Sequence, residues 1–252
     1  MTVITEVAGN VLVITLNRPE SRNAINLAMA DAVDTALLDL DADPALAVGI
    51  LTGAGGTFCS GMDLKAFPHE GIPVAGDRGL AGLTRARPRK PLIAAVEGHA
   101  VAGGCELALA CDLIVASVGS RFGLPEVCRG LVAGEGGAVR LPRRIPYHVA
   151  MEMLLTGDSV TGVDAARWGM VNRLVPDGGA LGAALTLAER ISVNAPLAIA
   201  AVKDIVRRTE GVSDADAMAM QDPLHFRVAR SFDAVEGALA FAEKRPARWR
   251  HR

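Results

Sequence analysis

Three short apolar runs constrain the fold of this chain more than any other feature. They are Val48–Thr52, Leu92–Val96 and Leu113–Ala116, and none of them contains a charged residue. A helix is expected around 104–111, between the second run and the third. Short apolar strands that alternate with helices indicate an α/β fold in which the strands are buried on both faces.

The flanking segments add further elements to this core. Residues 3–7 and 11–16 are rich in β-formers and are separated by Gly9-Asn10, which predicts a hairpin. The stretch 26–40 has apolar residues at helical spacing, with Asn26 as its expected cap. Beyond residue 134 we expect a brief strand at 171–175 and helices near 147–155, 162–168, 180–192, 196–208 and 231–243. The Gly- and Pro-rich region 66–90 has few apolar anchors and predicts a mobile loop, with one helical turn at most, that lines or covers a site.

Composition and charge exclude several classes of function. A formal charge of −2 over 252 residues gives no electrostatic reason to expect a nucleic-acid partner. The basic run 85–90 fits a solvated loop, although a small phosphate-bearing ligand is an open alternative. The four cysteines form no CxxC pair and the five histidines show no metal-ligand spacing, so we expect no metal site and a reducing compartment. No signal peptide or membrane span is evident, which predicts a soluble cytoplasmic protein with no membrane partner.

Two glutamates stand out as candidates for chemistry. Glu106 interrupts the apolar run that follows Gly103-Gly104, and Glu126 follows Phe122-Gly123-Leu124-Pro125. A buried carboxylate is costly unless something pairs with it or uses it, so two of them suggest acid–base work. Each has a simpler explanation: Glu106 could complement a helix dipole, and Glu126 could be a surface carboxylate at the start of a loop or helix.

Two turns could supply backbone donors beside these acids. Gly103-Gly104 stands where a strand should turn into a helix, so its free N–H groups could face an oxygen that gains negative charge. The alternative is a turn that needs glycine only for close strand–helix packing. The segment 58–65 could supply a second N–H, or it could be an ordinary loop. The glycines at 53–56 fail the spacing of a dinucleotide-binding motif.

Taken together, these motifs resemble the crotonase family of enoyl-CoA hydratases and isomerases, nearly end to end. The resemblance rests on co-linear segments: Asn17-Arg18-Pro19 with Asn23-Ala24, Phe58 to Lys65, Pro91 to Gly98, Ala102 to Glu106, Phe122 to Glu126, Gly130-Leu131, Gly134 to Gly137, Leu155 to Gly157, Ala165 to Val171 and Phe241 to Arg245. It implies an α/β spiral of ββα units with a helical C-terminal trimerisation region. Residues 1–190 would form the spiral core with the CoA site, and 191–252 the C-terminal helical oligomerisation region of a homotrimer or a dimer of trimers.

The resemblance also implies roles for individual residues. The backbone N–H groups of Met62 and Gly103 would form an oxyanion hole for a CoA thioester carbonyl. Coenzyme A would enter as the thioester substrate, with no separate cofactor. It would be held by residues of two segments: Arg22, Ala24, Ser60, Asp63, Leu64 and Lys65.

Hydratases of the family resemble this chain in keeping both acids, whereas many isomerases keep only the later one. The resemblance therefore implies an enoyl-CoA hydratase, a hydro-lyase in which Glu106 deprotonates water and Glu126 protonates C2 of a trans-2-enoyl-CoA to give a 3-hydroxyacyl-CoA. The alternatives are an enoyl-CoA isomerase, a carnitinyl-CoA-type dehydratase, of which 167–173 is reminiscent, or a non-catalytic acyl-CoA-binding protein. Two departures concern the acyl specificity: Met62 is bulkier than usual, and Glu135 adds a carboxylate that could face the acyl pocket.

Overall fold

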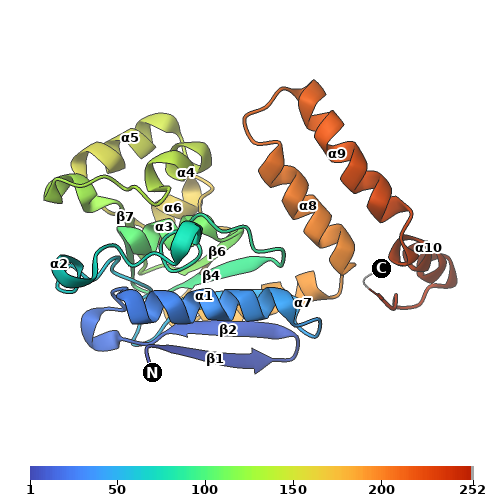
Figure 1. Cartoon of the computed structure of the whole chain (residues 1–252), viewed down its shortest axis with the longest axis horizontal. Helices are drawn as coiled ribbons and strands as arrows, with labels where there is room; N and C mark the ends of the chain where they lie inside the picture. The colour runs from blue at the N-terminus through green and yellow to red at the C-terminus, as the bar shows by residue number, and fades with distance from the viewer. Residues whose placement is uncertain (251–252) are drawn as a thin grey trace.

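A computed structural model describes residues 1–250 and contains a six-stranded sheet at its centre (Figure 1). Its order is β1-β2-β3-β4-β6-β9, in which β1 is antiparallel to β2 and the other neighbours are parallel. The strands are β1 (Val3–Ala8), β2 (Val11–Leu16), β3 (Val48–Gly53), β4 (Leu92–Val96), β6 (Leu113–Ser117) and β9 (Arg173–Val175). The predicted hairpin and the three apolar strands are confirmed, and the strand expected at 171–175 begins two residues later.

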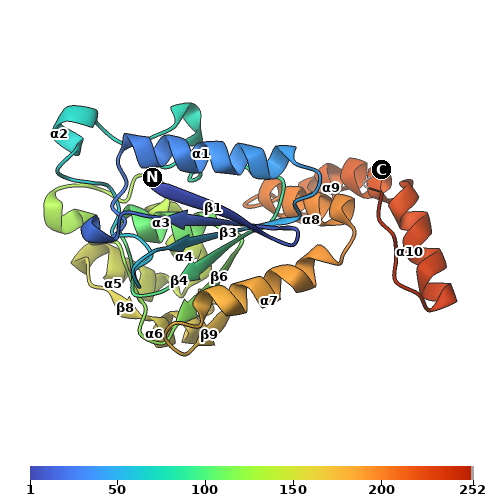
Figure 2. The same cartoon turned by 90° about the horizontal axis from the view of Figure 1, so that it is seen from below.

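Helices cover both faces of this sheet. Helix α1 (Leu27–Ala42) lies on one face and α7 (Ala180–Ser192) on the other, as Figure 2 shows. Ile50 of β3 packs in the cluster that contains Ala184 of α7, whereas its neighbour Leu51 packs in the larger cluster with Leu37 of α1. The side chain of Asn26 accepts the N–H of Met29 and caps α1 as predicted. The α/β expectation with strands buried on both faces is confirmed.

A second, smaller sheet positions the region of interest. It contains β5 (His99–Val101), β7 (Arg121–Gly123) and β8 (Val160–Thr161), with β5 parallel to β7 and β7 antiparallel to β8. Strand β5 leads into α3 (Gly103–Ala110), and β7 leads into the 3₁₀ helix η3 (Pro125–Arg129). Because parallel neighbours end on the same side of a sheet, the starts of α3 and η3 lie next to each other.

The other helices fill the space around these sheets. The segments expected near 147–155, 162–168, 180–192, 196–208 and 231–243 are all helical. Among residues 1–250 the sequence pattern missed two α-helices, and each contains an internal proline, Pro142 or Pro223. The remaining bounds are η1 (Pro19–Ser21), α2 (Phe67–Glu70), η2 (Gly76–Arg78), α4 (Gly137–Arg144), α5 (Tyr147–Thr156), α6 (Gly162–Arg167), α8 (Pro196–Arg208), α9 (Asp214–Ala229) and α10 (Phe232–Glu243). Leu80 and Leu83 of the segment 66–90 are buried in the core, so this segment is anchored there although it has few apolar residues.

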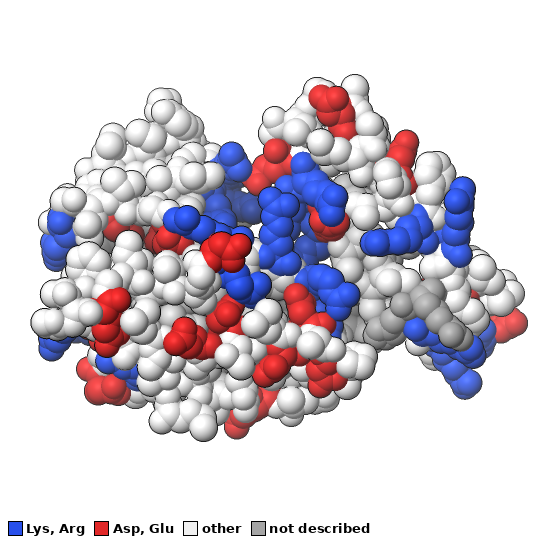
Figure 3. Space-filling model, in the orientation of Figure 1, with Lys and Arg blue, Asp and Glu red and all other residues white. Residues whose placement is uncertain are grey.

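Helices α8, α9 and α10 extend from one end of the sheet (Figure 1). Ion pairs attach α8 to the core, where Lys203 Nζ lies 2.6 Å and Arg207 Nη2 3.1 Å from the carboxylate oxygens of Asp112. Arg143 of α4 pairs with Glu210 at 3.0 Å, just after α8. Lysine and arginine side chains accordingly gather in the hollow between the core and these helices (Figure 3).

Residues 251 and 252, at the end of the predicted oligomerisation region 191–252, lie outside the described residues. Within residues 1–250, no single helix is long and apolar enough to cross a membrane. Helices α7 and α8 have that length and composition only when taken together, and they are bent by 108° relative to each other.

Candidate active site

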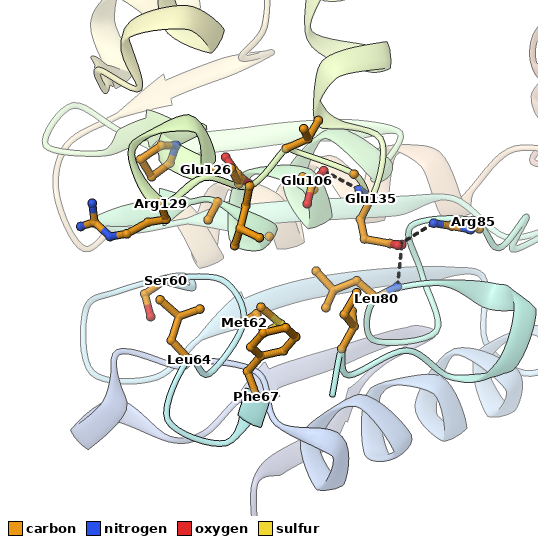
Figure 4. Close-up of a pocket in the computed structure, with 17 residues that line it drawn as sticks. Ser60, Met62, Leu64, Phe67, Leu80, Arg85, Glu106, Glu126, Arg129 and Glu135 are labelled. Atoms are coloured by element: carbon orange, nitrogen blue, oxygen red, sulfur yellow. Dashed lines mark hydrogen bonds and ion pairs between the residues drawn. The ribbon is translucent and has the colours of Figure 1, made fainter. Parts of the chain in front are cut away.

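The starts of α3 and η3 line one pocket of about 430 Å³ (Figure 4). Glu106 comes from α3 and Glu126 from η3, and both lie along one side of this pocket. Met62 and Leu64 lie on the facing side, with further apolar side chains from the segment 67–80. The structure thus brings together the two acids that sequence reasoning had singled out twenty positions apart.

Glu106 is anchored by the main chain. Its side chain is buried, and its Oε1 accepts two N–H groups at 2.8 Å, from Glu135 and Gly137. Burial raises the pKa of Glu106 to about 7, the negative charges of Glu126 and Glu135 act in the same direction, and the two N–H donors oppose the rise. Glu106 therefore titrates near neutral pH, as a group that exchanges protons with a substrate should.

Glu126 has no comparable anchor. Its Oε2 is buried and accepts no hydrogen bond from residues 1–250, and burial raises the pKa of this carboxyl. A buried oxygen without a donor favours the protonated carboxyl over the carboxylate. The charge of Glu126 also raises the pKa of Glu106, so the titrations of the two acids are coupled.

A strained turn aims a backbone N–H into the same pocket. Ala102 has φ 51° and ψ −130°, a conformation that is costly for a residue with a side chain, and Gly103 follows as the first residue of α3. A Cβ built on Gly103 would lie 3.6 Å from the nitrogen of Met62, so the two residues are neighbours in space. Neither N–H donates a hydrogen bond within residues 1–250. Two adjacent unpaired donors at a helix N-terminus can stabilise an oxygen that gains negative charge.

Gly103 and Gly104 were expected to serve either as backbone donors or for close strand–helix packing, and each explanation holds for one of the two glycines. A Cβ on Gly104 would collide with the backbone oxygen of Cys59, so Gly104 serves close packing of α3. A Cβ on Gly103 would meet the side chain of Leu80 and stand beside the Met62 nitrogen. The packing explanation therefore holds for the second glycine, and the first has the position that a backbone donor requires.

The residues expected around coenzyme A fall into two groups. Ser60 and Leu64 line the pocket, whereas four residues do not: Arg22, Ala24, Asp63 and Lys65. Of these four, Arg22 and Lys65 are exposed and Ala24 is buried. Asp63 is held by Arg18, whose Nη1 lies 3.0 Å from its Oδ2 and 2.6 Å from the carbonyl oxygen of Ala24. Arg18 belongs to the Asn17-Arg18-Pro19 motif and was not predicted as a site residue, yet it joins the two segments of the predicted CoA site.

Glu135 lines the pocket, but its carboxylate is fully engaged. It accepts a hydrogen bond from the N–H of Leu80 at 3.0 Å, and Arg85 Nη2 lies 2.7 Å away (Figure 4). It also accepts a hydrogen bond from the hydroxyl of Thr84 at 2.6 Å. Although burial works against it, these donors hold the pKa of Glu135 below its usual value. Leu80 and Arg85 also line the pocket, as do Phe67, Ile72, Arg129, Leu131 and Val132, and none of these had been predicted as a site residue.

Known proteins share this sequence and fold over nearly their whole length. The family model described as enoyl-CoA hydratase/isomerase matches residues 6–252. The enoyl-CoA hydratase EchA19 of Mycobacterium tuberculosis is 41% identical over 256 residues, which cover 99% of this chain and 96% of the relative. The carnitinyl-CoA dehydratase of Proteus mirabilis is 42% identical over 97% of this chain and 96% of its own length.

A solved structure leads to the same family. The crystal structure of an enoyl-CoA hydratase from Mycobacterium tuberculosis H37Rv has a TM-score of 0.97 to this one, with 52% identity over 100% of this chain and 99% of the other. The resemblance stated from the sequence motifs is confirmed, and so is the fold class that it implied. The chain belongs to the enoyl-CoA hydratase/isomerase family, with the crotonase fold of two sheets and C-terminal helices.

Proposed function

We propose that the protein is an enoyl-CoA hydratase, which adds water reversibly to a trans-2-enoyl-CoA to give a 3-hydroxyacyl-CoA. The observation that carries the proposal is the meeting of Glu106 and Glu126 on one side of a single pocket, opposite the backbone of Met62. One carboxyl alone could move a proton from place to place on a substrate, as an isomerase does. Hydration needs a base for water and an acid for carbon, and two carboxyls meet that need.

The thioester carbonyl oxygen would accept the N–H groups of Met62 and Gly103. Glu106, as the carboxylate, would take a proton from water while the water oxygen bonds to C3. The electron pair of the C2–C3 bond would move towards the carbonyl, and its negative charge would be stabilised by the two N–H groups. Glu126, as the carboxylic acid, would then deliver its proton to C2. Since both carboxyls lie on the same side of the pocket, the two additions would occur on one face of the double bond, which is syn addition.

The environments of the two acids support this division of labour. The N–H groups of Glu135 and Gly137 stabilise the ionised form of Glu106, whereas the buried Oε2 of Glu126 has no donor. The reacting pair carries one proton before the addition and one after it, on the opposite partner. Dehydration of a 3-hydroxyacyl-CoA would follow the same path backwards.

The proposal includes the binding of coenzyme A and the assembly of the protein. Coenzyme A would lie along the segments 22–24 and 60–65, where the exposed cations Arg22 and Lys65 suit its phosphates. Residues 191–252 would form the oligomerisation region of a trimer or hexamer, beside a core of 1–190. Apolar side chains exposed on α8, α9 and α10 support an interface there: Val202, Val206, Met218, Phe226, Leu239 and Phe241. The four free cysteines suit a reducing compartment, the cytoplasm.

The test is the loss of conjugated enoyl-thioester absorbance with crotonyl-CoA and with a longer-chain analogue. We expect the wild type to consume at least one of them and Glu126→Gln to lose that turnover while it still binds the ester. Absence of turnover by the wild type on both, with binding intact, would contradict the proposal.

A second candidate is a carnitinyl-CoA-type dehydratase, favoured by the 42% identity to the Proteus mirabilis enzyme. This reaction would use the same two acids on a different acyl group, so carnitinyl-CoA is tested alongside crotonyl-CoA and the specificity constants are compared. Product analysis separates hydration from double-bond isomerisation. Binding that is unaffected by Glu106→Gln and Glu126→Gln, with no turnover in any variant, would identify a non-catalytic acyl-CoA-binding protein.

A further inference from the structure

Glu135 contacts two parts of the pocket at once. Its carboxylate reaches the segment 80–85, and its main-chain N–H holds Oε1 of Glu106. The residue thus connects the segment 80–85, which lines the pocket, to Glu106, the acid that is proposed to activate water. The mechanism proposed for Glu106 and Glu126 does not use these contacts of Glu135.

We propose that Glu135 is a positioning residue: its carboxylate ties the segment 80–85 to the backbone of 135–137, and this tie fixes the two N–H groups that orient Glu106. The proposal deepens the hydratase function and rests on it, because the orientation matters only if Glu106 moves a proton. It assigns Glu135 no contact with the substrate and no proton transfer of its own.

The tie uses both carboxylate oxygens. Oε2 accepts from Leu80 and Thr84, and Oε1 pairs with Arg85, while the side chain is only 12% exposed. The hydroxyl of Thr84 also accepts the N–H of Leu80 at 2.8 Å, so the three groups close a compact ring. A largely buried carboxylate with three donors fixes the geometry of its neighbours better than a single exposed ion pair would.

Arg140 makes a second tie between the same segments. Its guanidinium donates to the carbonyl oxygen of Glu135 at 3.0 Å and also to the carbonyl oxygen of Thr84. Gly136, with φ +105°, leaves the room that this guanidinium occupies, since a Cβ there would collide with it. Two ties between one pair of segments indicate that their relative position is important to the pocket.

The negative charge of Glu135 and the ordered N–H donors of 135–137 affect the pKa of Glu106 in opposite directions. The charged groups that face Glu106 are Glu126 from η3, Glu135, and Arg140 from α4, with the buried thiol of Cys105 beside it. Removal of the negative charge of Glu135 alone would lower the pKa of Glu106. Loss of the ordered N–H donors would raise that pKa, because these donors stabilise the carboxylate.

The experiment therefore starts with Thr84→Val, which removes one of the three donors to the Glu135 carboxylate without changing any charge. We expect kcat to fall about tenfold, within the ~10²-fold that a misplacement of about 1 Å can cause. The acid limb of the kcat profile should move upward by about half a pH unit, while KM changes less. Thr186→Val removes a comparable hydroxyl bond on α7, far from the pocket, and is expected to change neither value.

Glu135→Gln, and its combination with Thr84→Val, complete the test. Both substitutions weaken the same link between Glu135 and the segment 80–85. The loss of kcat in the double variant should therefore be clearly smaller than the product of the two single losses. A Glu135→Gln variant that keeps full kcat and shifts the acid limb downward would show a charge effect only and overturn the proposal. So would an unchanged profile in Thr84→Val.

Infrared titration of the Glu106 carboxyl, assigned by difference from Glu106→Gln, gives the same shift without turnover. If the wild type hydrates no substrate, the proposed function fails, yet the titration still decides whether Glu135 positions Glu106. If Glu135→Gln does not fold, Thr84→Val alone carries the test, because valine keeps the shape of threonine.

Discussion

The segments that hold Glu106 and Glu126 give the two carboxyls different hydrogen-bond environments, although both follow short strands of the same small sheet. Glu106 belongs to the regular helix α3, and two main-chain N–H groups from 135–137 bind one of its oxygens. Glu126 belongs to the 3₁₀ helix η3 and has a buried oxygen with no donor. In the proposed mechanism, the two donors suit Glu106 to act as the carboxylate, and the buried oxygen without a donor suits Glu126 to act as the acid.

The largest expected effect tests whether both acids are needed. Glu126→Gln and Glu106→Gln should each lower kcat by ~10²–10⁴-fold, the usual contribution of a positioned acid or base. Initial rates of enoyl-thioester loss measure this, and circular dichroism checks the fold. Glu189→Gln, on the exposed side of α7, is the matched control and should keep full activity. Retained turnover in Glu106→Gln would leave Glu126 as the only working acid and favour an isomerase.

The second effect uses stability to separate the two segments. The pKa of Glu106 is raised to about 7 in the folded protein, against 4.5 as its ordinary value, so the contribution of this residue to stability falls as the pH rises from about 4.5 to 7. Glu106→Gln removes this penalty and should raise the free energy of unfolding at pH 8 by about 3 kcal/mol at most. Urea unfolding at pH 8 and pH 4 measures it, with the gain absent at pH 4. A loss of stability at pH 8 would show that the ionised form is needed for folding.

The third effect concerns the two glycines at the start of α3. Gly104→Ala places a Cβ against the backbone oxygen of Cys59 and should cost ~1–3 kcal/mol or more of stability, because backbone cannot move aside. Gly103→Ala meets the flexible side chain of Leu80 and should cost less stability but more turnover, since it crowds the donor at Met62. Thermal unfolding together with kcat compares them. Equal losses of both properties in the two variants would contradict the division between them.

The smallest effect is the pH dependence near neutrality. In the proposed mechanism turnover requires ionised Glu106, so with a pKa of about 7 the rate at pH 7 should be about half of its plateau and should fall further at lower pH. Burial also raises the pKa of Glu126, and in the proposed mechanism loss of its proton should produce a descending limb. The kcat profile between pH 5 and 10 measures both limbs, which belong to the coupled pair. A rate that is highest at pH 5 would contradict the assignment of Glu106 as the base.

The larger sheet could be predicted from the sequence because its strands carry their own pattern. The runs at 48–52, 92–96 and 113–116 are buried on both faces and read as uninterrupted apolar segments. The smaller sheet gives no such pattern, since strands of two or three residues that include the exposed His99 and Arg121 are too short to show a period. Only the resemblance to a family implied these strands.

The site was predictable as a set of residues but not as a geometry. Glu106 and Glu126 could be identified because each interrupts an apolar or Gly/Pro-rich stretch. The ties from Arg18 to Asp63 and from Glu135 to Thr84 span 45 and 51 positions, and no local pattern links such residues. They follow from the way the sheets bring distant loops together, which a single sequence does not display.

The strained turn at Ala102 has a consequence for how a substrate would bind. Its unusual φ and ψ are maintained by the surrounding fold, with the Ala102 N–H bonded to the carbonyl oxygen of Gly123 at 2.9 Å. The orientation of the Gly103 N–H is therefore settled when the chain folds and not when the thioester arrives. The donor is preorganised, so little conformational entropy remains to be lost at this point of the pocket on binding, and more of the interaction energy is available to the transition state.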